Sequence, residues 1–227
     1  MKPQNILLSR YGTLVEMVRA DHIAKGAIGK GHDFYHALRV ANMCLKISDY
    51  DSLIDELAWV AGLIHNVDHL FPANEIGSNL IRYFDATSLC AEYRHIIKLA
   101  VERHSGRNHP DDSDVQICLM DADKVVCLEA DVIMRAAQFV CHLPTFDPRF
   151  VRTDDPSANY RNPKTVIRDL LGVLEWVDLD GWFRLPKALE MAQERAKFIR
   201  LFINTFARQL EAANMLSPEF PEELITN

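Results

Sequence analysis

Apolar residues recur at helical spacing along almost the entire chain, and this periodicity is the strongest constraint on the fold. Within residues 4–24, for example, Leu7, Leu14 and Val18 fall on one face, and charged residues occupy the opposite face. No sustained alternation of apolar and polar residues, bounded by turn residues, indicates a β-strand. The sequence therefore predicts an all-α protein.

Turn residues divide this pattern into separate expected helices. Asp33 and Asp51 each precede an apolar stretch, so we expect them to cap the helices that follow. The expected helices cover residues 4–24, 34–49, 52–67, 75–85, 86–104, 115–142, 164–178 and 186–213. The segment 105–114 is predicted to be a loop, and the Pro- and Asp-rich segment 143–163 a surface excursion or a lid.

Length and composition limit the class of protein. The 227 residues suffice for a single domain, which we expect to comprise a core at 20–145 and a helical extension at 164–213. A net charge of −7 disfavours nucleic-acid polymers as partners. No apolar run is long enough to span a membrane, and the five cysteines show no CxxC spacing. These features predict a cytoplasmic protein with no membrane partner.

Three of the apolar stretches contain residue types that bind metal ions. The candidates and their local strings are His36 in HDFYHALRV, the pair His65 and Asn66 in AGLIHNVD, and Asp123 in LMDADKVV. Imidazole nitrogens and carboxylate oxygens suit a first-row divalent ion, and an incomplete protein ligand set leaves coordination positions for water and substrate. An unpaired carboxylate among apolar neighbours, as at position 123, would be costly without a cationic partner.

In this order and spacing, the strings resemble the motifs of the HD-domain superfamily of metal-dependent phosphohydrolases. That signature is a His, a His-Asp pair and an Asp, all on one divalent metal. HDFYHALRV, VERHSG and the pattern of residues 188–211 resemble a bacterial subgroup of small HD hydrolases. The resemblance covers most of residues 20–211 and implies an HD-domain, phosphodiesterase-like helical bundle. It also implies one bound divalent ion (Mn, Co, Zn, Fe, Ni or Mg) with His36, His65, Asp123 and position 66 as ligands.

One departure from the family pattern falls on the ligand set itself. Asn66 stands where the family has Asp. Its carbonyl oxygen can still serve as a weak, neutral ligand, or its amide can bind a water molecule on the metal. Loss of an anionic ligand should weaken the metal site and make it more positive. A second departure places Val125 and Val126 after Lys124, where the family often has Leu and Asp. These differences concern the activity and leave the fold prediction intact.

Other polar residues near the motifs are candidates for acid–base chemistry. Asp68 and His69 follow His65 by three and four residues, so they would share its helix face if that helix continued. A histidine titrates near neutrality and suits proton transfer. His104, in VERHSG, is a candidate to assist proton transfer, to bind phosphate or to hold a second metal ion. The alternative for Asp68 and His69 is a structural role, in which they cap or end the helix.

Basic residues beside the motifs are candidates to bind phosphate. Arg39 lies one turn after His36, Lys124 is next to Asp123, and Lys30 is a weaker candidate. All of these are also compatible with ordinary solvated charges. The remaining histidines, which we expect to be structural or on the surface, are His22, His95, His109 and His142. The aromatic residues Trp176, Trp182 and Phe183 are expected to belong to the C-terminal core.

The resemblance implies a phosphohydrolase that acts on a small phosphorylated metabolite or a nucleotide. A divalent ion lowers the pKa of its bound water, which makes hydroxide available for attack on phosphorus near neutral pH. Asn66 supports an alternative, a degenerate HD domain that binds a ligand or partner without turnover. A third hypothesis is a di-iron HD-type oxygenase, which would need further ligands from Asp68, His69 and His104.

Overall fold

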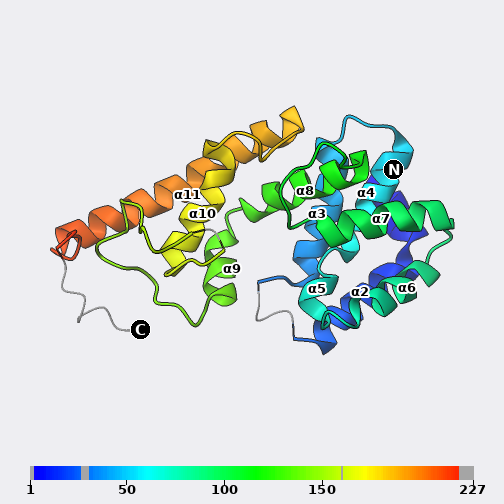
Figure 1. Cartoon of the computed structure of the whole chain (residues 1–227), viewed down its shortest axis with the longest axis horizontal. Helices are drawn as coiled ribbons and strands as arrows, with labels where there is room; N and C mark the ends of the chain where they lie inside the picture. Colours follow the sequence, from blue (N-terminus) through cyan, green and yellow to red (C-terminus); the bar gives the residue numbers. More distant parts are fainter. Residues whose placement is uncertain (1–2, 27–30, 160, 220–227) are drawn as a thin grey trace.

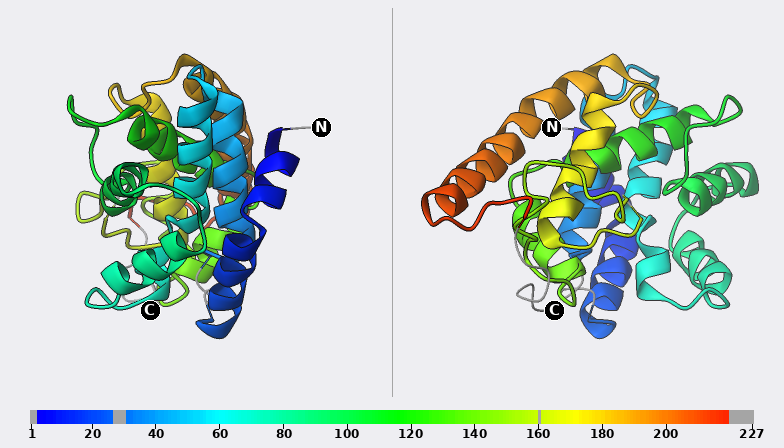
Figure 2. Two further views of the ribbon diagram at one scale, coloured as in Figure 1. Left: turned by 90° about the vertical axis from the view of Figure 1, so that its right-hand side faces the viewer. Right: turned by 60° about the vertical axis from the view of Figure 1, so that its left-hand side comes forward.

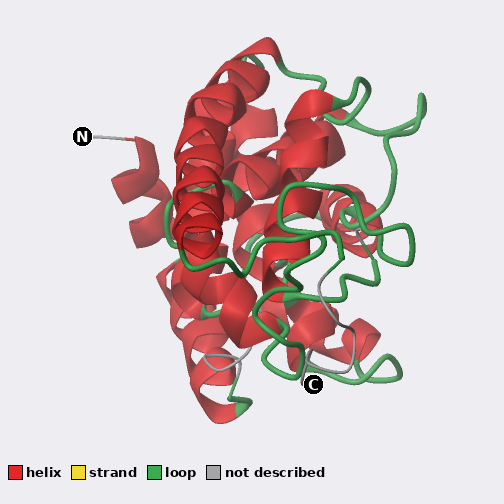
Figure 3. Ribbon diagram, turned by 90° about the vertical axis from the view of Figure 1, so that its left-hand side faces the viewer, coloured by secondary structure: helices red, strands yellow, loops and turns green. Residues whose placement is uncertain are grey.

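All regular secondary structure is helical in the part of the chain that the structure describes. The structure is a computed structural model and describes residues 3–26, 31–159 and 161–219. Its helices are α1 (Pro3–Arg10), α2 (Gly12–Ala24), α3 (Phe34–Ile47), α4 (Ser52–Ile64), α5 (Val67–Leu70), α6 (Ile76–Asp85), α7 (Ala91–Arg103), α8 (Asp114–Cys127), α9 (Val132–Phe139), α10 (Val166–Asp178) and α11 (Pro186–Ala212). Among these residues the only β interaction is an isolated bridge between Asn159 and Asn162. The predicted all-α fold is confirmed (Figure 3).

The helices form two groups that share one apolar interior. In Figure 1, α2 to α7 gather on one side, α9 to α11 lie on the other, and α8 joins them. A single hydrophobic cluster includes residues from both groups, from Leu7 on α1 to Leu210 on α11. Figure 2 shows the long helix α11 along the outside of the molecule. No described helix has the length and apolar character needed to cross a bilayer.

Local capping fixes the starts of the two helices that carry His36 and lead to His65. The carboxylate of Asp33 accepts a hydrogen bond from the backbone N–H of His36 at 2.8 Å. The carboxylate of Asp51 accepts from the N–H groups of Leu53 and Ile54 at 2.9 and 3.0 Å. Both predicted N-caps are confirmed, and the first places His36 within the first turn of α3.

The expected helix 52–67 is shorter than predicted. Helix α4 ends at Ile64, with His65 as its C-cap, and the short helix α5 begins after Asn66. The His65 ring contributes to this end, because its Nδ1 bonds to the carbonyl of Gly62 at 2.7 Å. Asp68 and His69 lie on α5, so the helix does not continue through them and the condition for a shared helix face with His65 is not met.

The expected helix 115–142 is divided into α8 and α9 by a charged turn. Glu129 and Asp131 lie in this turn and accept hydrogen bonds from the two terminal nitrogens of Arg39, at 2.7 and 2.6 Å. Glu129 also pairs with Arg195 on α11 at 3.0 Å. The turn thus joins α3 to α11, a long-range ion-pair arrangement that helix periodicity does not predict.

Two other expected helices also differ from the structure. The helix expected over 4–24 is interrupted at Tyr11, whose backbone leaves the helical region and whose ring stacks on Trp59 at a centroid distance of 6.0 Å. The helix expected over 86–104 begins at Ala91, after a turn. In both cases the sequence pattern overestimates helix length.

Helices α3 and α4 pack so closely that one glycine is required between them. A Cβ atom at Gly62 would lie 2.8 Å from both the Cα and the backbone nitrogen of Ala41. Real Cβ atoms do not approach backbone at that distance, so any side chain here would push the two helices apart.

We expect Gly62→Ala to lower the free energy of unfolding by about 1–3 kcal/mol, because the added methyl group overpacks the contact with Ala41. Gly77→Ala is the matched control. Gly77 is exposed on α6 with open space at its Cβ position, so alanine should leave stability unchanged or raise it by up to about 1 kcal/mol. Urea denaturation measures both. Equal effects of the two substitutions would contradict the close-packing argument.

Candidate metal centre

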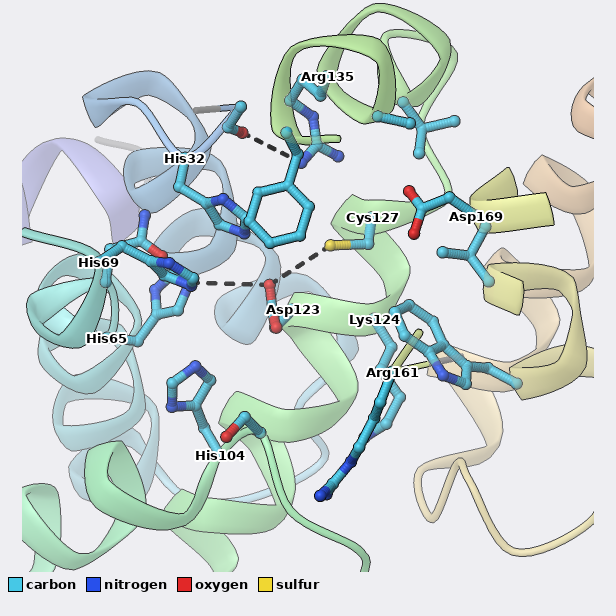
Figure 4. Close-up of a pocket in the computed structure, with 18 of the residues that line it drawn as sticks. His32, His65, His69, His104, Asp123, Lys124, Cys127, Arg135, Arg161 and Asp169 are labelled. Carbon is cyan, nitrogen blue, oxygen red and sulfur yellow. Dashed lines mark hydrogen bonds and ion pairs between the residues drawn. The ribbon is translucent and has the colours of Figure 1, made fainter. Parts of the chain in front are cut away.

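Three of the four predicted ligands converge in the structure. His36 on α3, His65 at the end of α4 and Asp123 on α8 each offer one donor atom, and these atoms lie within 4.8 Å of one another. Nε2 of His36 is 3.3 Å from Oδ1 of Asp123, and Nε2 of His65 is 3.7 Å from the same oxygen. Figure 4 shows His65 beside Asp123. This cluster could hold a metal ion.

His65 is held in the tautomer that a metal ligand needs. Its Nδ1 bonds to the carbonyl of Gly62, so the proton resides on Nδ1 and the lone pair of Nε2 is directed toward Asp123. Burial lowers the pKa of His65 well below its ordinary value, so the ring is neutral near pH 7. The neutral imidazole can therefore coordinate a metal ion through the lone pair of Nε2.

Asp123 supplies the negative charge of the cluster. Burial alone would raise the pKa of Asp123, but the surrounding imidazoles of His36, His65 and His104 hold this pKa well below its usual range. The carboxylate is thus ionised at neutral pH. The neighbouring carboxylate of Asp121 has a different role, because its Oδ2 accepts hydrogen bonds from the backbone N–H groups of Arg184 and Leu185, immediately before α11. Asp123, the predicted ligand, thus lies beside the imidazoles, whereas Asp121 does not take part in the cluster.

Asn66 is buried beside the cluster with its amide unsatisfied. The residue is 1% exposed and lines the adjacent cavity. Among the described residues, neither its Oδ1 nor its Nδ2 has a hydrogen-bond partner. A buried polar group without a partner costs roughly 1–3 kcal/mol, which a metal ion or a water molecule on it would relieve. The residues present therefore fit a divalent ion, with Asn66 as a neutral neighbour or weak ligand.

A cavity of about 640 Å³ opens next to these residues. Its lining includes all three predicted acid–base candidates, Asp68, His69 and His104. The His104 ring lies 5.2 Å from that of His65, and its Nδ1 bonds to the Val101 carbonyl at 2.7 Å. His69 stacks on His32 at 4.0 Å, and burial lowers the pKa of His69. The structure thus brings these candidates to the edge of the candidate metal centre.

Of the residues predicted to bind phosphate, Lys124 lines the cavity and Arg39 does not. Arg39 does not line the cavity, and its guanidinium is neutralised by Glu129 and Asp131, so it is a structural residue here. Lys124 does line the cavity, but it is buried and its Nζ donates to the Met120 carbonyl at 3.0 Å. Lys30 lies outside the described residues.

Sequence reasoning missed the arginines that do reach the cavity. These are Arg107, Arg135 and Arg161. Arg107 and Arg161 belong to segments without periodicity, and Arg135 follows the unpredicted break between α8 and α9, so no local signal places them. The Arg107 guanidinium lies 3.7 Å from the Trp182 ring centroid.

The four histidines expected to be structural or on the surface are buried in one case and exposed in three. His22 is buried, with its Nδ1 bonded to the Val18 carbonyl at 2.8 Å, and the other three, His95, His109 and His142, are exposed. Trp176 is buried in the hydrophobic cluster as expected, and Trp182 packs against it. Both tryptophans also line the cavity, which the prediction of a purely structural role did not include.

Comparisons with known proteins agree on the fold. A structure from Lactobacillus plantarum, solved by structural genomics, matches with a TM-score of 0.66 and 19% identity, covering 93% of this chain and 99% of that one. Bacillus subtilis YpgQ, in complex with ADP, matches with a TM-score of 0.64 and 17% identity, covering 89% and 96%. No protein-family model matches the sequence. No curated protein matches it either. The likeness to these structures establishes a shared fold.

We expect the metal-free protein to lose stability as the pH falls below about 6.5, the ordinary pKa of histidine. His65 is neutral when folded because burial lowers its pKa, and it gains a proton on unfolding. The stabilising contribution is therefore present above the unfolded pKa and is lost below it, by up to about 1.4 kcal/mol per pH unit.

Denaturation in EDTA at several pH values between 7.5 and 5.5 measures this slope. His65→Gln should reduce the slope, leaving the contribution of His22 and His69, whose pKa values burial also lowers. His142→Gln, at an exposed position, should keep the slope of the unmodified protein. An unchanged slope in His65→Gln would refute the assignment to this ring.

Proposed function

We propose that this protein is a metal-dependent phosphohydrolase of the HD type that acts on a small phosphorylated compound. The observation that carries the proposal is the convergence of His36, His65 and Asp123 beside a cavity that also contains cationic side chains. The three converging residues are also three of the four predicted ligands that carry the resemblance to the HD superfamily. A two-histidine, one-carboxylate set leaves coordination positions for water and a phosphoryl oxygen.

The charge of the cavity favours an anionic ligand once a metal ion is bound. Four carboxylates and four cationic side chains line it, so its formal charge is zero with neutral histidines. The residues are Asp68, Asp123, Asp169 and Glu175, and Lys124, Arg107, Arg135 and Arg161. A divalent ion makes the total +2. Aspartate in place of Asn66 would reduce that total by one, so this chain holds a more positive site than the family pattern gives.

Within this proposal the side chains divide into ligands and proton carriers. His36, His65 and Asp123 would hold the ion, which would acidify water and polarise a phosphoryl oxygen when bound. His69 is a neutral imidazole near pH 7, so one of its ring nitrogens can accept a proton. The stacked ring of His32 fixes the plane of His69.

A nucleotide is one of the compounds to be tested. YpgQ, which shares the fold, is described in complex with ADP, although its 17% identity supports the fold alone. The tryptophans in the cavity wall would also suit a planar ring. The proposal itself requires only a phosphoryl group.

A second candidate function is binding without turnover, and Asn66 is the observation that favours it. A neutral amide replaces an anionic ligand at a buried position. Such a site would hold the metal more weakly while still attracting anions.

A third hypothesis, the di-iron oxygenase, needs a second set of ligands. In residues 3–26, 31–159 and 161–219, only one group of three His, Cys, Asp or Glu donors lies within 4.8 Å, which weighs against it.

Metal analysis of the purified protein, followed by a phosphate-release screen with Mn²⁺, Co²⁺, Zn²⁺ or Fe²⁺, tests the proposal. We expect one ion per chain and phosphate release that EDTA abolishes. His36→Ala should remove both. Failure to bind any of these ions, together with no phosphate release, would overturn the proposal. Metal binding without release from any compound would instead favour the non-catalytic alternative.

We expect Asn66→Asp to raise metal affinity at least tenfold, because it restores an anionic group beside the ion. Isothermal titration with Mn²⁺ measures this, and phosphate release is measured in parallel. Asn204→Asp is the matched control, with the same charge change at an exposed position outside the cavity. An affinity equal to that of the unmodified protein would mean that Asn66 does not approach the ion. Release that appears only in Asn66→Asp would identify a decayed enzyme.

A further inference from the structure

Helix α10 presents a chemically distinct wall to the cavity. Asp169, Val173 and Trp176 all line it and follow one another at spacings of four and three residues, so they share one helix face. Figure 4 shows Asp169 on the opposite side of Asp123 from His65 and His69. The wall therefore combines a carboxylate with an apolar side chain and an indole, across from the candidate metal centre.

The Asp169 carboxylate has no partner. Among the described residues, no hydrogen bond or ion pair to it is found, and burial raises its pKa to about 6. The neighbouring acid on α10 differs, because Glu175 pairs with Arg168 at 2.7 Å. A partly buried carboxylate without a donor carries a desolvation cost, and a donor brought by a ligand would offset it.

The same carboxylate cannot be a phosphate contact. An anion beside Asp169 would be repelled, whereas an anion beside a divalent ion on His36, His65 and Asp123 would be attracted. A phosphorylated compound in this cavity is therefore oriented, with its phosphoryl group toward the metal ligands and its other end toward α10. That other end meets the Asp169 acceptor and the surfaces of Val173 and Trp176.

We propose that Asp169 accepts a hydrogen bond from a hydroxyl or amino group on the non-phosphorylated end of the substrate, while Val173 and Trp176 pack against an apolar or ring surface beside that group. Helix α10 thereby selects compounds that carry such a donor. This inference rests on the proposed function in one respect, since the other end of the cavity is taken to receive the phosphoryl group.

Ligand binding tests the proposal independently of turnover. Trp176 and Trp182 line the cavity, whereas Trp59 is fully buried in the core and does not, so ligands are expected to change tryptophan fluorescence. The probes are pairs that differ by one donor. One pair is adenosine 5′-monophosphate and purine riboside 5′-monophosphate; the other is ribose 5-phosphate and 2-deoxyribose 5-phosphate. Titrations are done with Mn²⁺ and, separately, with EDTA.

We expect the unmodified protein to bind the donor-bearing member of at least one pair about tenfold more tightly, as for a hydrogen bond to a charged acceptor. Asp169→Asn should reduce that ratio below about threefold. Asp178→Asn is the matched control, since it makes the same change on α10 at an exposed residue that pairs with Arg200, and it should keep the ratio.

Stability and kinetics separate recognition from a structural role. Because the carboxylate has no partner, Asp169→Asn should be no less stable than the unmodified protein. For any pair member that is hydrolysed, the substitution should raise KM with kcat changed less than about twofold. Loss of folding in Asp169→Asn would assign the residue to structure and overturn the proposal.

The remaining outcomes are also decisive. No discrimination within either pair, whether the probes bind equally or do not bind, would overturn the proposal. Discrimination that depends on Asp169 but comes without any phosphate release would support this inference while the proposed hydrolase activity fails. The two proposals therefore fail in distinguishable ways.

Discussion

The close approach of α3 and α4 at Gly62 sets the geometry on which the candidate site depends. A methyl group at this residue would lie 2.8 Å from backbone atoms of Ala41. This approach brings His36 on α3 and His65 at the end of α4 to the same carboxylate oxygen of Asp123. Gly62 also supplies the carbonyl that orients the His65 ring. One small residue thus controls both the spacing of the two imidazoles and the position of a proton, and three rigid helices hold the donors.

The convergence of His36, His65 and Asp123 was predictable because buried polar side chains in apolar helices need partners, and the order of the motifs indicated that these residues would lie together. The capping residues Asp33 and Asp51 were predictable because their hydrogen bonds span two or three residues. Helix ends were not, since the end of α4 involves a bond from the His65 side chain. Arg39 was misassigned for a related reason. Its carboxylate partner Glu129 lies ninety residues later in the chain, and the sequence around Arg39 does not indicate that contact.

The outer walls of the cavity were the least predictable part of the site. Arg161 and Asn159 come from an irregular segment, and α10 reaches the cavity through the packing of the C-terminal helices. Asp121 contributes to that packing, because its carboxylate accepts hydrogen bonds at 2.8 Å from the backbone N–H groups of Arg184 and Leu185, immediately before α11. Sequence periodicity identifies α10 as a helix with an apolar face. It does not say that Asp169 on that helix will face a cavity.

Asp121 and Asp123 lie two residues apart on α8, yet one fixes the start of α11 and the other faces the imidazoles. The candidate metal centre, on α3, α4 and α8, and the proposed ligand wall on α10 are built from different parts of the chain. In evolutionary terms the two parts can diverge at different rates. Under the proposed function, substitutions along α10 would change which compounds bind while α3, α4 and α8 stay under constraint. Related chains would then share the metal centre and differ in substrate.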